Sequence, residues 1–382
     1  MNEGMANIPD AVVLEFQPDT WEARWRRVAA WSAELARVQG TNAQLLAHPL
    51  IAIIDRPKGA EFLEDLGIEI ASPGVPFPKL DPAIRELAFA LDDHLAWEAF
   101  EEGQSQILPF EKVAFESLRC VSDSELNRAL ASLPVFPAAA QKALQLLSTE
   151  TWNASDVQAI AASDQVLASS LIRVANSCSC GARKTITTLN HAIAYLGAQR
   201  ASGVLIAASV KRLFAPPRLR QIWDHSIDAS EVSRNLAKLS RHANPEEAFL
   251  AGLVHDIGRL AMALLPERFQ TRSTHLSEQG CQLSLVEQVL CGATHAEIGA
   301  SALERWKFPQ NLVEAVRFHH RPEQTESPLA AVLYLMERSI NPEETPPSLV
   351  RSKAALDRLR LSAGMEFSVD PGWRDNPLRF QS

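Results

Sequence analysis

From about Ser124 to Arg338 the sequence is a succession of segments in which apolar residues recur every three to four positions. This period is that of an α-helix with one face against a core. Connectors with turn-forming residues, such as the prolines at 216 and 217, separate the segments. From about Ser124 onward we find no credible strand, so this part of the chain is predicted to be all-α. The predicted helices are 137–147, 155–162, 165–176, 191–196, 201–214, 217–240, 245–264, 283–291, 296–306, 309–319 and 328–338.

The first hundred or so residues differ from this helical region. Short β-like runs predict strands at 11–16, 50–55 and 68–72, and helical patterns are expected at 21–38, 62–66 and 81–103. A chain of 382 residues is long enough for two domains of about 150 residues each. We therefore predict a mainly α protein with three parts. These are a small α/β domain of unknown identity at 1–120, a helical domain at 124–340, and a C-terminal extension at 341–382 with one helix at 352–361.

Composition restricts the partners and the compartment of the chain. The net charge is −9, from 46 acidic and 37 basic residues, which argues against general nucleic-acid binding. The N-terminus lacks the pattern of a signal peptide, and no apolar run reaches about 18 residues. We therefore expect a soluble cytoplasmic protein that does not bind membranes. The five cysteines form no C-x-x-C pair, which argues against a disulfide framework and against a cysteine-based zinc site.

An unusual pair of polar residues interrupts the predicted helix 245–264. Asn244 and Pro245 suit its N-cap and first turn, and the apolar period continues to its end. His255 and Asp256 nevertheless stand side by side in its middle. A buried carboxylate without a partner is costly, so Asp256 must shift its pKa or meet a cation. Gly258, two residues further on, permits close approach by a neighbouring helix or a ligand.

Four further histidines and one glutamate lie inside or at the end of other predicted helices. Taken singly, each has a simpler explanation as a surface residue or a hydrogen-bonded core residue. His319 and His320, for example, suit the C-terminal end of a helix dipole. Together they form a mixed nitrogen and oxygen donor set suited to one or two divalent ions such as Fe, Mn, Ni or Zn. The candidate metal ligands are His225, His255, Asp256, His295, His319, His320 and Glu337.

The order of these residues resembles that of the HD superfamily of metal-dependent phosphohydrolases. More narrowly, several stretches resemble the HDOD family, the HD-related output domain of bacterial signalling proteins. The similar stretches are LPVFPAAAQKALQLL (133–147), ASDQVLASSLIRVANS (162–177), TTLNHAIAYLGAQR (187–200), IWDHS (222–226), AFLAGLVHDIGRL (248–260), THAEIGASALERWKFP (294–309) and VRFHH (316–320). The resemblance covers roughly residues 130–340 and implies an all-helical HD-type fold.

The resemblance also implies roles for the candidate residues. His225, His255 and Asp256 match metal ligands, and Glu337 stands where HD enzymes usually have aspartate. The other three histidines match the extra ligands of two-metal variants, with Asp256 as the bridge. Arg259 follows the HDIG run where HD enzymes often have lysine, and its guanidinium suits a phosphate. Asp256 and Arg259 are thus the candidate catalytic residues, although Arg259 could equally be a helix-surface charge.

Two functions follow from the resemblance. HD-GYP phosphodiesterases, which hydrolyse cyclic di-GMP, have a Gly-Tyr-Pro motif after the paired histidines, whereas this chain reads HHRPEQTESPLAAV. That activity is therefore not supported. HDOD domains are mainly regulatory, so we expect a signalling protein that binds a protein partner or a nucleotide second messenger, as a homodimer or alone. The alternative is an active metal-dependent phosphohydrolase or phosphodiesterase that acts on a nucleotide or cyclic nucleotide.

Overall fold

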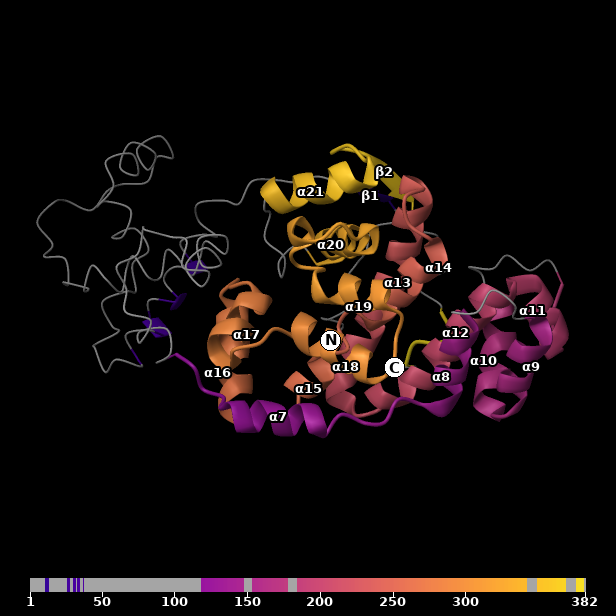
Figure 1. Cartoon of the computed structure of the whole chain (residues 1–382), viewed down its shortest axis with the longest axis horizontal. Helices are drawn as coiled ribbons and strands as arrows, with labels where there is room; N and C mark the ends of the chain where they lie inside the picture. Colours follow the sequence, from indigo (N-terminus) through magenta and orange to yellow (C-terminus); the bar gives the residue numbers. More distant parts are fainter. Residues whose placement is uncertain are drawn as a thin grey trace, which may run out of the picture. The chain divides into compact units, whose positions relative to one another are not determined.

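The computed structural model describes residues 26, 27, 30, 31, 33, 34 and 37 and the ranges 11–13, 118–147, 153–177, 184–341, 349–368 and 376–380 (Figure 1). The predicted α/β domain at 1–120 lies almost wholly outside these residues, as do the strands at 50–55 and 68–72 and the helices at 62–66 and 81–103. The chain divides into two compact units. One contains 1–17, 124–265 and 294–382, and the other contains 18–123 and 266–293.

The first unit is helical, which confirms the predicted fold class for this part of the chain. Apart from α7, which was not predicted, its helices follow the predicted apolar segments, and two of their connections contain short 3-10 turns. The helices are α7 (Asp123–Ala131, from Ser124 on), α8 (Ala138–Leu147), α9 (Ala154–Ala162), α10 (Gln165–Ala175), α11 (Leu189–Leu196), α12 (Ala198–Val210), α13 (Arg220–Ser240), α14 (Pro245–Val254), α15 (Arg259–Met262), α18 (His295–Arg305), α19 (Gln310–Arg317), α20 (Pro328–Ile340) and α21 (Leu349–Leu359). The 3-10 turns are η3 (Lys211–Phe214), η4 (Pro217–Leu219) and η5 (Pro322–Gln324).

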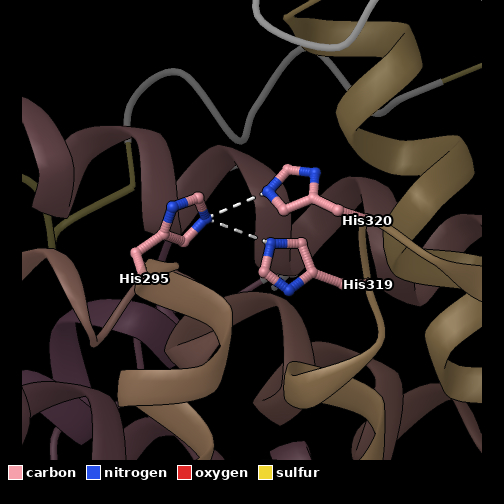
Figure 2. A group of neighbouring side chains, drawn as sticks. All are labelled: His295, His319 and His320. Atoms are coloured by element: carbon pink, nitrogen blue, oxygen red, sulfur yellow. Dashed lines mark hydrogen bonds between the residues drawn. The ribbon is translucent and has the colours of Figure 1, made fainter. Parts of the chain in front are cut away.

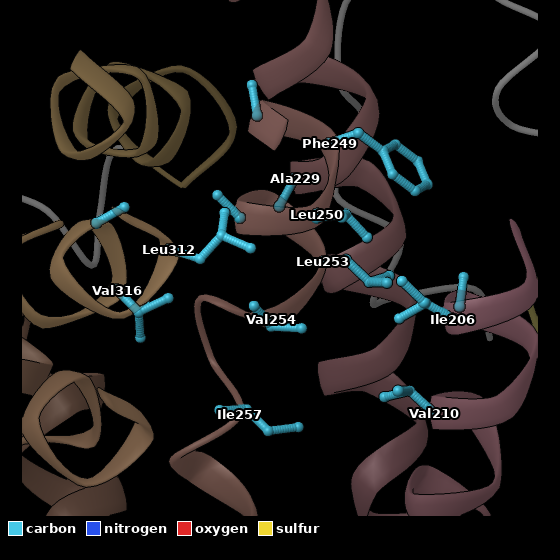
Figure 3. Close-up of a cluster of buried hydrophobic side chains, with 14 of the residues drawn as sticks. Ile206, Val210, Ala229, Phe249, Leu250, Leu253, Val254, Ile257, Leu312 and Val316 are labelled. Atoms are coloured by element: carbon cyan, nitrogen blue, oxygen red, sulfur yellow. The ribbon is translucent and has the colours of Figure 1, made fainter. Parts of the chain in front are cut away.

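Helix α14 forms the centre of this unit. Asn244 caps its N-terminus by accepting hydrogen bonds from the backbone N–H groups of Glu246 and Glu247. Every residue from Ala248 to Val254 is buried, because α14 packs against α12, α13, α19 and α20. Figure 3 shows its apolar side chains between those of α12 and α19. Burial of one such large apolar side chain stabilises the fold by about 1.5–3 kcal/mol.

The predicted helix 245–264 is not continuous, and this part of the prediction is wrong. Helix α14 ends at Val254, and α15 begins at Arg259. The backbone between them forms three-residue turns, with the N–H of Ile257 donating to the carbonyl of Val254 at 3.0 Å. The apolar spacing does not reveal this break. Val254, Ile257 and Leu260 are three residues apart, and this spacing suits both an α-helix and a 3-10 helix. His255 and Asp256 therefore lie in a turn between two helices.

The prediction of no strand after Ser124 is also wrong. Strand β2 (Glu366–Ser368) pairs antiparallel with β1 (Ala11–Val13), with Val12 opposite Phe367. Each strand has only three residues, which is too short for an alternating pattern to stand out in the sequence. The partners also lie at opposite ends of the chain, so no local signal predicts their pairing.

The helices of the second unit whose bounds are described are α16 (Glu267–Glu278) and α17 (Leu283–Cys291), and the described residues between 26 and 37 are also helical. Helix α16 was not predicted, because only Phe269, Ser273 and Leu276 among its residues are buried. Arg272 of α16 forms an ion pair with Glu34 of the same unit. Among the described residues, Cys120, Cys281 and Cys291 form no disulfide.

Of the helices that the structure describes, none taken singly has both the length and the apolar composition to cross a membrane, although the bent pair Leu189–Leu196 and Ala198–Phe214 meets these criteria together.

Candidate metal centre

Five segments of the first unit bring the candidate ligands together. His225 lies in α13, the His255–Asp256 pair lies in the turn after α14, and His295 begins α18. The paired histidines follow α19, and Glu337 lies in α20. All seven side chains proposed from the sequence meet in one buried cluster, and Arg259 joins them. The ligand atoms form two groups around Asp256.

The first group contains His225, His255 and Asp256, whose nearest ligand atoms all lie within 4.8 Å of one another. The Oε1 atom of Glu337 lies 3.0 Å from Nε2 of His225 and 2.9 Å from Nε2 of His255. This group therefore presents two imidazole nitrogens and two carboxylates to a common point. Helices α13 and α20 pack against each other, and this packing brings His225 and Glu337 together.

The second group contains His295, His319 and His320, shown in Figure 2. Nε2 of His295 lies 3.0 Å from Nε2 of His320 and 3.4 Å from Nε2 of His319. Asp256 lies between the two groups, because its Oδ1 is 3.2 Å from Nε2 of His295 and its Oδ2 is 3.5 Å from Nε2 of His255. A carboxylate in this position can contribute one oxygen to each group.

Backbone carbonyls hold two of the imidazole rings in place. Nδ1 of His255 lies 2.7 Å from the carbonyl oxygen of Gly252, and Nδ1 of His319 lies 2.6 Å from that of Val316. A carbonyl only accepts hydrogen bonds, so these contacts assign the proton to Nδ1 in both rings. With Nδ1 as the donor, Nε2 is the nitrogen of each ring that faces the centre, as in metal-binding histidines.

The centre is buried, and its charges are tightly coupled. Burial alone would raise the pKa of the Asp256 carboxyl, but the Arg259 guanidinium and the nearby imidazoles hold this pKa below its usual range. Nε of Arg259 lies 2.9 Å from Oδ2 of Asp256. Burial, reinforced by the charge of His295, lowers the pKa of His319 to about 3. At neutral pH, Asp256 is therefore ionised and His319 is neutral, which are the forms that bind metals.

The donor set fits a divalent cation. Among the residues that the structure describes, several buried atoms of the centre have no hydrogen-bond partner of ordinary geometry. They are Nε2 of His255, both carboxylate oxygens of Asp256, Oε2 of Glu337 and Nδ1 of His320. Since a buried polar atom without a partner costs about 1–3 kcal/mol, a cation among these atoms would offset that cost.

Comparison with known proteins identifies the family of the helical domain. Residues 133–322 match the sequence profile of the HDOD domain. The chain carries an HDOD domain. An uncharacterized protein of Treponema pallidum (strain Nichols) is 21% identical over 210 residues, which are 53% of this chain and 41% of that protein. The chain thus spans less than half the length of this relative.

Solved structures share the fold of the HDOD domain. An HDOD domain protein of unknown function from Geobacter sulfurreducens has a TM-score of 0.55 and 20% identity, over 66% of this chain and 93% of that one. A candidate phosphohydrolase from Shewanella amazonensis SB2B has a TM-score of 0.52 and 23% identity, over the same shares. A candidate signal transduction protein from Marinobacter aquaeolei VT8 has a TM-score of 0.54 and 20% identity, over 66% of this chain and 62% of that one. At these identities the likeness concerns the fold.

The HDOD domain also contains site contacts that the sequence did not reveal. The carbonyls of Gly252 and Val316, which orient His255 and His319, lie three residues before the histidine that each contacts. Any residue type offers a carbonyl, so no residue pattern could have identified them. The ion pair between Arg259 and Asp256 places the guanidinium of this arginine beside the cluster.

Proposed function

We propose that this protein is a signalling regulator whose HDOD domain holds one or two divalent metal ions and acts mainly by binding. The observation that supports this most strongly is the convergence of two ligand groups on Asp256, with buried donor atoms left unpaired. The cluster is also closed. The side chain of His225 is 20% exposed, whereas those of His255, Asp256, His295 and Glu337 are at most 1% exposed. A large substrate would have little access to ligands buried in this way, so the burial favours a structural or regulatory role for the ion over catalytic turnover.

In this proposal each ligand group holds one ion. His225, His255 and Glu337 surround the first position, and the three histidines of the second group surround the other. Asp256 would contribute to both through its two oxygens, since they face different groups. A divalent ion bound there supplies Lewis acidity and positive charge for contact with an anionic ligand.

Arg259 would have two effects in this centre. Its contact with Oδ2 restrains the Asp256 carboxylate, and its positive charge keeps that carboxylate ionised. The Arg259 side chain is 17% exposed, so part of it also reaches the surface. A guanidinium at this position suits a phosphate group of a nucleotide second messenger.

The alternative function is an active phosphohydrolase that acts on a nucleotide or cyclic nucleotide. The complete set of ligands and the guanidinium of Arg259 favour it. The position of Glu337 argues against it, because one of its oxygens already lies near two imidazoles of the first group. A carboxylate so placed reduces the room for a substrate oxygen beside that position.

Metal content tests the centre itself. We expect the full chain, reconstituted separately with Fe, Mn, Ni or Zn and then desalted, to retain one or two equivalents of at least one of these metals. Asp256→Ala removes the residue shared by both groups, so bound metal should fall to near zero. His242→Ala is the matched control, because His242 is exposed and contacts the backbone carbonyl of Ser240 outside the centre. No retained metal in the wild-type chain would exclude the proposal.

Turnover separates the two functions. The metal-loaded chain is incubated with nucleotides and cyclic nucleotides, and product release and binding are measured on the same samples. The regulatory function predicts binding of a nucleotide or a signalling protein without product release. Metal-dependent product release that Asp256→Ala abolishes would instead establish the phosphohydrolase. Measurement of molecular mass in solution tests whether the regulator is a homodimer.

A further inference from the structure

The described C-terminal residues Asn376–Phe380 lie along η3 and α13 and are held there through their main chain. Nε1 of Trp223 donates a hydrogen bond to the carbonyl of Leu378 at 2.8 Å. Nζ of Lys211 donates to the carbonyl of Arg379 at 2.6 Å, and the N–H of Phe380 donates to Oδ1 of Asp224 at 3.3 Å. Three successive residues therefore have a main-chain group bound by a side chain of η3 or α13.

The side chains of the same three residues are also recognised individually. Leu378 is 1% exposed and joins the main apolar core. The guanidinium of Arg379 forms an ion pair with Asp228 of α13. The ring of Phe380 lies 4.7 Å from Nζ of Lys211 and 5.3 Å from the guanidinium carbon of Arg220, which are cation–π distances. The domain thus contacts an apolar side chain, a cationic side chain and an aromatic ring, in that order along the segment.

Recognition of this kind is typical of a groove that binds a separate peptide. In such grooves, main-chain hydrogen bonds give affinity, and pockets for individual side chains give specificity. The segment forms its own turn, with the N–H of Leu378 donating to Oδ1 of Asn376 at 3.0 Å and the N–H of Arg379 donating to the Asn376 carbonyl at 3.0 Å. Its residues belong to no helix or strand of the described chain.

We propose that the surface formed by Lys211, Arg220, Trp223, Asp224 and Asp228, here named the α13 groove, is a peptide-binding site whose occupant is the chain's own C-terminal segment. The segment leaves and re-enters the groove while the helical unit stays folded. It is therefore a reversible ligand attached to the domain.

Occupancy of the α13 groove should affect metal binding by the first ligand group. This inference rests on the proposed function, in which that group holds an ion. Asp224 immediately precedes His225 on α13, and Asp228 lies three residues beyond it. The segment therefore contacts α13 on both sides of a candidate ligand. While it is bound, α13 is restrained in the position that directs His225 toward Glu337. Release of the segment loosens this restraint, so the affinity of the first ligand group for metal should fall.

Hydrogen exchange of the wild-type full chain tests whether the segment leaves on its own. We expect the amides of Leu378 and Phe380 to exchange at least about tenfold faster than the core amides of α13, through an opening that does not unfold the helix. Exchange of these amides at the same rate as the α13 core would overturn the proposal, because the segment would then be a fixed part of the domain.

Peptide binding tests the groove directly. The probe is a labelled peptide of residues 373–382, and the protein is the full chain with Leu378→Asp and Arg379→Glu, which expel the attached segment. We expect this variant to bind the peptide at least about tenfold more tightly than the wild-type chain, in which the attached segment lowers the fraction of free groove. A peptide carrying Arg379→Glu is the matched control and should bind more weakly. Failure of the natural peptide to bind the variant, with helical content retained, would overturn the proposal.

A metal titration of the same variant, with and without peptide, separates this proposal from the proposed function. If the peptide binds and strengthens metal binding, both are supported. If the peptide binds but the wild-type chain retains no metal, the groove stands and the proposed function fails. If the peptide binds without changing metal affinity, the groove stands and its coupling to His225 is excluded.

Discussion

Glu337 is the residue in which this centre departs from the pattern it otherwise resembles, because HD enzymes usually have aspartate there. Burial would raise the pKa of its carboxyl, but the charge of His225 and the hydrogen bond with the His225 imidazole hold this pKa well below its usual value. The carboxylate is thus ionised between two imidazoles. The longer side chain lets one oxygen reach both rings at 3.0 and 2.9 Å.

Glu337→Asp should therefore weaken the first ligand group, although the charge is retained. Removal of one methylene draws the carboxylate back from His225 and His255, and we expect the affinity for one metal equivalent to fall by about 10- to 100-fold. Calorimetric titration of the full chain measures this change. Glu326→Asp is the matched control, because Glu326 is 96% exposed and pairs with Arg358 outside the centre. Unchanged affinity in Glu337→Asp would show that Glu337 is not a ligand.

The residues of the centre were predictable because their chemical types are unusual where they stand. Histidines at the ends and in the middle of apolar helices, and a carboxylate beside one of them, carry information that needs no structure. Their supports were not predictable. The carbonyls of Gly252 and Val316 act through the backbone, so the residue type says nothing about them.

At the scale of elements, the turn between α14 and α15 places the His255–Asp256 pair. Gly258 lies in this turn with ordinary helical dihedral angles, and its lack of a side chain allows another backbone to approach it. A Cβ atom at Gly258 would lie 2.0 Å from the carbonyl oxygen of His295 and 2.7 Å from the backbone nitrogen of Gly299. Helix α18 therefore approaches the turn as closely as backbones allow, and this approach brings His295 to Asp256. The sequence indicated a close approach at Gly258, but it did not indicate the break in the helix.

Gly258→Ala should separate the turn from α18. Because both clashing groups belong to the backbone, neither can rotate away, and we expect a loss of stability of about 1–3 kcal/mol. His295 should also move from Asp256, so the second ligand group should lose affinity for metal. Thermal unfolding and metal titration measure the two effects.

Gly203→Ala is the matched control for this prediction. A Cβ atom at Gly203 of α12 would make only ordinary contacts of 3.5 Å with the ring of Phe249. Alanine in a helix interior is favoured over glycine by about 0.5–1 kcal/mol, so this variant should be as stable as the wild type or slightly more stable. A Gly258→Ala variant as stable as Gly203→Ala would contradict the argument from close approach.

At the scale of the whole molecule, the helical character was predictable and the division into units was not. Apolar periods of three to four residues identify helices locally, which explains the agreement over α8 to α13 and α17 to α20. Helices α16 and α17 group with residues 18–123, although they lie within the segment that matches the HDOD domain. Contacts such as that between Glu34 and Arg272 join residues far apart in the sequence, so no local pattern reveals them.

The division into units predicts where bound metal stabilises the chain. All the candidate ligands belong to the first unit, whereas α16 and α17 belong to the second. An ion that binds only the folded first unit stabilises it by about 2.7 kcal/mol at 100 times the dissociation constant. Some amides of α13, α14 and α20 exchange only when this unit unfolds. In the presence of metal at that concentration, they should therefore exchange about 100-fold more slowly than in its absence. Amides of α16 and α17 should be unaffected.

Hydrogen exchange with mass spectrometry, resolved by peptide, distinguishes these regions in a single full-length sample. Asp256→Ala should show no difference between samples with and without metal, which excludes effects of the added ion elsewhere on the surface. Equal protection of α16 and α17 would mean that the two units unfold together, so that the first unit cannot respond to metal by itself. Protection confined to α13, α14, α18 and α20 would instead place the bound ion among the ligands that surround Asp256.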